Sequence, residues 1–556
     1  MKLKHIIILL LATAAAASLY GNNTSGYSAD SCLQNCALRM LNHWDNLDGT
    51  VERGYAGRSI FWNTGGIDTA RIRQYAEKCR RYGYNATVLN NVNASPKILT
   101  KEYLDTVSIY AGIMRQYSIK VFLAVNFASP KALGEEPTAD PLDRGVRAWW
   151  AKKAEDIYSS IPDFGGFLVK ASSEGQPGPN DYGRSHAEGA NMLAEVLKPH
   201  GGQVIWRAFV YDASETDRAK QAYTEFAKLD GLFLPNVIIQ IKNGPIDFQP
   251  REPVSPLFFA MHKTRLMAEL QITQEYMGHS NHIVFLAPMW REFFEAIRGV
   301  PLAGIAGVAN IGLDTMTRKL SCGYDLAEYN WQALNNLQLI DDRTDSIAQM
   351  MRMSHEACVD YMMPLGLHHL FAWGHHYGPQ PWCDIKGARR DWMPAYYHRA
   401  DSCGIGFDRT MATGSGATAQ YPRQMCEMYE TLDSCPEKYL LWFHHVPWNY
   451  SRRWECNGTT ETLWLHLCHH YQRGIDAVRK MKALAPSYME MLTTQERDAV
   501  WWKDACLLYF QTFSHQELPD DVEKPAPSHS LDKLQSIDLG ITNYEAPSRQ
   551  LLDSVR

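Results

Sequence analysis

The feature that most constrains the fold is a regular alternation of short apolar runs with longer amphipathic segments between residues 58 and 308. Helices are predicted between most of these runs, the first over Asp68–Tyr82 with Asp68 as its N-terminal cap. Alternating strands and helices imply parallel pairing, and eight such units in about 250 residues fit a TIM (β/α)8 barrel better than an open doubly wound sheet. The eight predicted strands are Arg58–Trp62, Asn85–Leu89, Lys120–Val125, Phe167–Val169, Val204–Arg207, Val237–Ile241, Met267–Ile272 and Gly304–Val308.

The strand pattern fades after about residue 320, and the rest of the chain is predicted to be mainly helical. The predicted fold class is therefore α/β: a TIM barrel over residues 39–320, followed by a mainly α-helical C-terminal domain over residues 321–515. Residues 516–556 are polar, with several Pro and Ser, and are expected to form a polar tail. The predicted C-terminal helices are Tyr324–Trp331, Asp345–Met363, Pro422–Thr431, Leu463–Leu484 and Thr494–Phe513.

The N-terminus has the pattern of a secretory signal peptide. A basic start, Met1–Lys4, precedes an apolar stretch, His5–Ala17, that ends in small residues. We expect a signal peptide over residues 1–20, a linker over residues 21–38, and an exported protein in the periplasm or outside the cell. No later stretch is long and apolar enough to predict a membrane span.

Charge and motifs argue against several classes of partner. The net charge of −6 does not favour nucleic acid or an anionic membrane. No GxGxxG or Walker sequence follows any predicted strand, so nucleotide binding has no support. The paired histidines at 368–369, 375–376 and 444–445 lack the carboxylate or cysteine spacing of a metal site, so we expect neither a metal nor another cofactor.

Charged residues gather where four successive strands end. Because the carboxyl ends of parallel strands lie on one face of a barrel, these side chains are expected to be neighbours. They could form ion pairs on the barrel rim, or they could form a catalytic site. The carboxylates are Glu174, Asp247 and Glu275, and the cations are Lys170, Arg207 and Lys242.

The catalytic alternative fits glycoside hydrolysis. That reaction needs one carboxylic acid to protonate the leaving oxygen, and a second carboxylate to attack the sugar or to activate water. Glu174, on a Gly- and Pro-rich loop that cannot become a helix, is the leading candidate. The cations suggest that the sugar itself carries a carboxylate, because Arg and Lys bind that group well.

The sequence resembles the α-glucuronidases of glycoside hydrolase family 67 over residues 39 to about 510. Long matching segments in the right order are far more specific than any single motif. Members of that family usually carry an N-terminal β-rich domain, whereas here only the predicted signal peptide and linker precede Leu38. The sequence is therefore either a natural short form or an incomplete gene model, and we expect an exported bacterial protein. The matching segments include Asn42–Asp48, Val51–Gly57, Lys170–Pro179, Trp206–Tyr211, Lys242–Gln249, Leu270–Tyr276 and Trp442–Trp448.

The resemblance implies removal of α-1,2-linked glucuronic or 4-O-methylglucuronic acid from glucuronoxylan-derived oligosaccharides, with inversion. It places the general acid on Glu174 and leaves Asp247 and Glu275 as alternative bases. It also implies uronate contacts, a C-terminal domain that contributes Trp448 or Trp442 to the pocket, and a homodimer as one assembly to test. The implied uronate contacts are Lys170, Arg207 and Lys242.

Two other functions compete with this one. A non-catalytic carbohydrate-binding protein on a barrel scaffold would be favoured by loss of a carboxylate, yet Glu174, Asp247 and Glu275 are all present. A barrel glycosidase acting on a neutral sugar would have no use for the cations.

Overall fold

The computed structural model describes most of the first 361 residues and part of the C-terminal region. The described ranges are residues 36–51, 58–63, 65–210, 218–244, 248, 254–272, 283–309, 324–361, 453–456, 459–514, 517–518 and 520–529.

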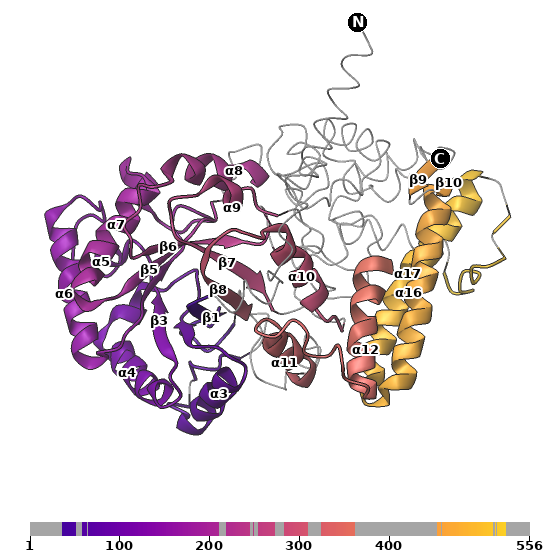
Figure 1. Ribbon diagram of the computed structural model, residues 1–556, viewed down its shortest axis with the longest axis horizontal. Coiled ribbons are helices and arrows are strands. Elements are labelled where there is room, and N and C mark those ends of the chain that lie inside the picture. Colours follow the sequence, from indigo (N-terminus) through magenta and orange to yellow (C-terminus); the bar gives the residue numbers. More distant parts are fainter. Residues whose placement is uncertain are drawn as a thin grey trace, which may run out of the picture.

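Eight parallel strands close into a barrel in chain order, with β8 pairing back onto β1 (Figure 1). The predicted TIM barrel is therefore confirmed. The strands are β1 (Leu38–His43), β2 (Ala86–Leu89), β3 (Lys120–Ala124), β4 (Gly166–Val169), β5 (Gln203–Arg207), β6 (Val237–Lys242), β7 (Leu266–Gln271) and β8 (Leu302–Ala309).

Helices follow most strands and surround the barrel (Figure 1). Asp68 caps the first of them as predicted, because its side chain accepts a hydrogen bond from the Arg71 backbone N–H. The barrel helices are α3 (Thr69–Arg81), α4 (Lys101–Arg115), α5 (Ser129–Ala132), α6 (Arg144–Ser160), α7 (His186–Leu197), α8 (Arg218–Phe226), α9 (Leu257–Ala260) and α10 (Ala287–Ala296).

The first strand lies earlier than predicted. The predicted strand Arg58–Trp62 is wrong: this segment forms only an isolated bridge, Thr50 to Arg58, and the first barrel position belongs to β1. The buried carboxylate of Asp45 bends the segment, since it accepts hydrogen bonds from Ser59 Oγ (2.5 Å) and the Ile60 backbone N–H (2.6 Å). The apolar residues of the run are buried by packing on the barrel helices rather than by strand pairing.

The barrel interior changes from apolar to polar along the strands. Side chains on a strand alternate between the interior and the surrounding helices. Ile205, Ile238 and Met267 belong to one buried apolar cluster inside the barrel. Two residues further along the same three strands stand Arg207, Gln240 and Glu269, each at most 1% exposed. Polar groups are therefore stacked beneath the C-terminal mouth, where barrel enzymes place their sites.

A helical region follows the barrel. It contains α11 (Tyr324–Ala333), α12 (Ser346–His355), α16 (Leu463–Leu484) and α17 (Met489–Ser514), with a short hairpin of β9 (Arg453–Cys456) and β10 (Thr459–Thr462). Helices α12, α16 and α17 lie side by side next to the barrel (Figure 1). Over the described ranges, none of the helices combines the length and the apolar character needed to cross a bilayer.

Backbone groups after β7 join the helical region to the barrel. The Ile283 N–H donates to Gln495 Oε1 (3.1 Å), and the Phe285 N–H donates to Ser354 Oγ (2.9 Å). These bonds are buried, so the helical region is packed onto the barrel rather than tethered to it.

Candidate active site

Glu174 lies at the corner of a tight turn beyond β4. The backbones of Ser173 and Gln176 exchange two hydrogen bonds across this turn, 3.3 Å and 2.9 Å long. Glu174 and Gly175 between them have positive φ values of 50° and 76°, as a type I′ turn requires. This conformation is uncommon for a residue with a Cβ and is found more often at functional sites. The turn places the Glu174 carboxylate beside Lys170, with 14% of the side chain exposed.

Lys170 is a buried cation between two oxygen acceptors. Its Nζ lies 2.5 Å from Glu174 Oε2 and donates a 2.8 Å hydrogen bond to Asn93 Oδ1. Burial lowers the pKa of Lys170 to about 8; Glu174 acts against that shift, whereas the charge of Arg207 adds to it. The amine is therefore much closer to losing its proton near neutral pH than an ordinary lysine is.

Arg207, the last residue of β5, makes a two-pronged ion pair with Glu269 on β7. Arg207 Nη2 lies 2.6 Å from Glu269 Oε1, and Arg207 Nε lies 3.0 Å from Glu269 Oε2. Burial alone would raise the pKa of Glu269, but the charges of Arg207 and Lys242 and the hydrogen bonds from Arg207 hold it below its usual range. Glu269 thus stays ionised although it is fully buried, and it fixes the plane of the guanidinium.

Aromatic rings lie close to the three cations. Lys242, the last residue of β6, has its Nζ 3.7 Å from the centroid of the Phe209 ring and 4.6 Å from that of Phe248. The guanidinium carbon of Arg207 lies 5.6 Å from the rings of both Trp44 and Phe209. These distances are in the range in which a ring face attracts a cation.

Four of the predicted site residues therefore lie together at the C-terminal mouth: Lys170, Glu174, Arg207 and Lys242. Lys170 pairs with the predicted carboxylate Glu174, whereas Arg207 pairs with Glu269, which was not among the predicted carboxylates. The remaining predicted residues lie outside the described residues: Asp247, Glu275, Trp442, Trp448 and the paired histidines.

Sequence reasoning did not single out several residues of this site, among them Glu269, Phe209 and Asn93. Glu269 is the one charged residue in the strand Leu266–Gln271, and that isolation is the signal that could have identified it. Phe209 lies two residues after Arg207, so its side chain points to the same inward side of the strand. An aromatic residue at such a position looks like an ordinary core residue. Asn93 follows β2 in a run of asparagines and gave no signal of a lysine partner.

The arrangement offers one partly exposed carboxyl group for proton transfer and three cations for binding an anion. In the part of the chain that the structure describes, no three His, Cys, Asp or Glu side chains come together as metal ligands would. The described site therefore combines an acid or base with electrostatic recognition of a negatively charged group.

Comparisons with known proteins agree with this geometry. Residues 27–301 match the "Glycosyl hydrolase family 67 middle domain", and residues 328–523 match the "Glycosyl hydrolase family 67 C-terminus". The "Probable alpha-glucuronidase A" of Aspergillus flavus is 41% identical over 456 residues, which cover 74% of this chain and 54% of that protein. The "Alpha-glucuronidase A" of Emericella nidulans is 38% identical over 573 residues, which cover 91% of this chain and 66% of that protein.

The chain thus spans between about half and about two thirds of the length of these relatives. The two family matches follow one another in chain order, the first over the barrel strands and the second over the helical region. This chain belongs to glycosyl hydrolase family 67.

Proposed function

We propose that this protein is an α-glucuronidase that releases α-1,2-linked glucuronic or 4-O-methylglucuronic acid from xylo-oligosaccharides. The observation that carries the proposal is a cluster of three buried cations, Lys170, Arg207 and Lys242, beside the partly exposed carboxyl group of Glu174. The names of the family relatives support the same activity.

The cations would recognise the uronate. A carboxylate that enters a pocket loses its water, and fixed cations and hydrogen bonds must offset that loss. Glu269 holds the Arg207 guanidinium in one orientation before the ligand arrives, so little ordering is left to the binding step. A neutral sugar would leave the buried cations without that partner, so it should be bound poorly.

Glu174 would act as the general acid. It must carry a proton to protonate the leaving oxygen, although in the free protein its carboxylate contacts the ammonium of Lys170. The negative charge of a bound uronate would compete for Lys170 and would favour the neutral form of the nearby Glu174. Substrate binding would thereby favour the protonated form of Glu174 that the reaction needs.

The second carboxylate would come from Asp247 or Glu275. Inversion requires this group to activate a water molecule, with the two carboxyl groups roughly 6.5–9.5 Å apart. Trp448, or alternatively Trp442, would line the pocket from the C-terminal region. We also propose that the N-terminal segment directs export to the periplasm or beyond, where xylan fragments would be met.

The test is incubation of the full chain with aldouronic acids, with the products followed by NMR. Release of glucuronic acid that first appears as the β-anomer is the expected result. A first-formed α-anomer would contradict inversion, and binding without any release would favour a carbohydrate-binding protein.

A further inference from the structure

A single aromatic ring contacts all three cations of the site. The centroid of the Phe209 ring lies 3.7 Å from Lys242 Nζ, 5.5 Å from Lys170 Nζ and 5.6 Å from the guanidinium carbon of Arg207. The topology explains this position. Phe209 continues β5, the strand between β4 and β6, so its inward ring is flanked by the lysines at the ends of the two neighbouring strands.

Phe209 does not behave as an ordinary core residue. It is only 7% exposed, yet it belongs to neither of the two buried apolar clusters formed by the described residues. Its chain neighbours Ala208 and Val210 point the other way and do belong to the apolar cluster between the barrel and its helices. The described surroundings of the ring are therefore charged rather than apolar.

Three like charges that share one buried site repel one another, and burial weakens the screening by water. Glu174 pairs with Lys170 and Glu269 pairs with Arg207, and the charge of Glu269 also attracts Lys242. The negative face of an aromatic ring attracts cations, and the ring, unlike a carboxylate, carries no net charge that would repel an incoming anion. Lys242, which is closest to the ring, gains most from this contact.

We propose that Phe209 is a positioning residue that gathers Lys170, Arg207 and Lys242 around one aromatic ring and so sets the geometry of anion recognition. This inference rests on the proposed function only for its effect on selectivity. The placement of the cations by the ring can be tested without any substrate.

The structural test compares crystal structures of the wild type with those of Phe209→Leu and Phe209→Tyr. Leucine removes the ring face and keeps an apolar side chain, whereas tyrosine keeps the ring. We expect Lys242 Nζ to move in the leucine variant by more than the ~0.5 Å within which a working site is held, and to stay in place in the tyrosine variant. If all three cations keep their positions without the ring, the inference is overturned, whatever the protein's substrate proves to be.

The kinetic test measures turnover of a glucuronoside and of the matching glucoside. Phe209→Leu should raise KM for the glucuronoside about tenfold, equal to ~1.4 kcal/mol, with little change in kcat, because binding is lost equally in the ground and transition states. Phe209→Tyr should restore the wild-type KM. A loss in kcat alone, or no rescue by tyrosine, would contradict a role in gathering the cations.

Phe122→Leu is the matched control. Phe122 is 1% exposed in the apolar cluster lower in the same barrel, so this variant makes the same chemical change away from the cations. It should lower the Tm and leave the glucuronoside-to-glucoside ratio unchanged. An equal loss of selectivity in Phe122→Leu would mean that the effect of Phe209 is only one of packing. A wild type that cleaves no glucuronoside would instead overturn the proposed function, and the crystal structures would still decide the role of Phe209.

Discussion

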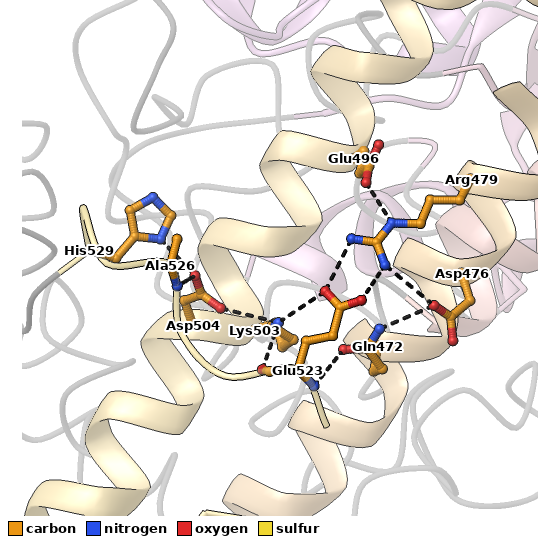
Figure 2. A network of polar contacts seen from close by, with 9 residues as sticks. All are labelled: Gln472, Asp476, Arg479, Glu496, Lys503, Asp504, Glu523, Ala526 and His529. Carbon is orange, nitrogen blue, oxygen red and sulfur yellow. Dashed lines mark hydrogen bonds and ion pairs between the residues drawn. The ribbon is translucent and has the colours of Figure 1, made fainter. Parts of the chain in front are cut away.

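Buried charges occur in two regions of the described structure, and their partners differ. In the barrel, the cations come from three neighbouring strands, and their partners include two carboxylates and the ring of Phe209. In the helical region, the buried pair Lys503 and Asp504 on α17 binds the segment 520–529 (Figure 2). Lys503 Nζ donates to the Glu523 carbonyl (2.9 Å), and Asp504 Oδ2 accepts from the Ala526 N–H (2.9 Å).

More exposed charges surround the second cluster. Glu523 pairs with Arg479 on α16, and Arg479 also binds Glu496 on α17 at 2.7 Å (Figure 2). His529 Nδ1 lies 2.7 Å from Asp504 Oδ2. These contacts fix a passing chain segment against two helices, and their partners are backbone groups or side chains of that segment.

The difference separates a binding role from a structural one. Charges that bind backbone groups of a passing segment stabilise that segment. Charges that lie at strand ends beneath a barrel mouth, and that share an aromatic ring, keep the capacity to bind a further anion. Substitutions in the two clusters should therefore have separable effects on activity and on stability.

The largest effect should come from Glu174→Ala. Removal of the general acid should nearly abolish turnover of natural aldouronic acids, whereas an aryl glucuronoside with a good leaving group should lose much less, because it needs little protonation. Steady-state kinetics on the two substrates gives the answer. Equal losses of turnover on the two substrates would show that Glu174 is not the general acid.

Arg207→Ala should lower kcat/KM on a glucuronoside by roughly two to three orders of magnitude, since truncating one partner of a desolvated charge pair costs about 2–5 kcal/mol. It should also destabilise the fold, because Glu269 would remain fully buried without its ion-pair partner. The double variant Arg207→Met with Glu269→Leu serves as the control. It should regain stability in chemical denaturation but not activity; recovery of activity would exclude uronate recognition by Arg207.

Asp504→Ala should change stability alone. Breaking a buried ion pair costs about 3–5 kcal/mol, because Lys503 would lose its neighbouring carboxylate inside the protein. The free energy of unfolding should fall by about this amount, while the glucuronoside-to-glucoside ratio of the folded protein stays the same. A changed ratio would show that the two clusters are coupled.

The smallest effect concerns pH. Burial lowers the pKa of Lys170 to about 8, so its ammonium loses its charge as the pH rises through that value. KM for a glucuronoside should therefore rise above pH 8, and Lys170→Arg, which keeps its charge, should shift that rise to higher pH. Because the pKa is lower in the folded state than in the unfolded one, this residue's contribution to the free energy of unfolding increases with pH between about 8 and 10.5. A KM that does not change between pH 7 and pH 9.5 would contradict a charged Lys170 in binding.

Much of the barrel and part of its site were predictable from the sequence. The alternation of strands and helices indicated the closed barrel, and the rule that strand ends share one face brought Lys170, Glu174, Arg207 and Lys242 together. The first strand was mispredicted for two reasons. The run around Phe61 is apolar because it packs against the barrel helices, not because it is a strand. The true strand, Leu38–His43, contains Arg39, Asn42 and His43 and therefore looks less like a buried strand.

The contacts of the site were less predictable. Arg207 and Glu269 are separated by 62 residues and lie on strands two places apart in the barrel, so their pairing depends on the lateral register of β5, β6 and β7, which no local pattern encodes. The contacts of the Phe209 ring were equally unpredictable from local patterns, because the three cations around it come from three different strands. The roles of Asp247, Glu275 and Trp448 stay predictions, since these residues lie outside the described part of the chain.

The central claim is that the buried cations recognise a sugar carboxylate. The most direct measurement is kcat/KM of the wild type on a glucuronoside and on the α-glucoside that differs only in bearing CH₂OH in place of the carboxylate. We predict a preference for the glucuronoside of at least about a hundredfold, or ~2.7 kcal/mol. If the kcat/KM values on the two substrates differ by less than a factor of about ten, worth only ~1.4 kcal/mol, then Lys170, Arg207 and Lys242 do not recognise the carboxylate.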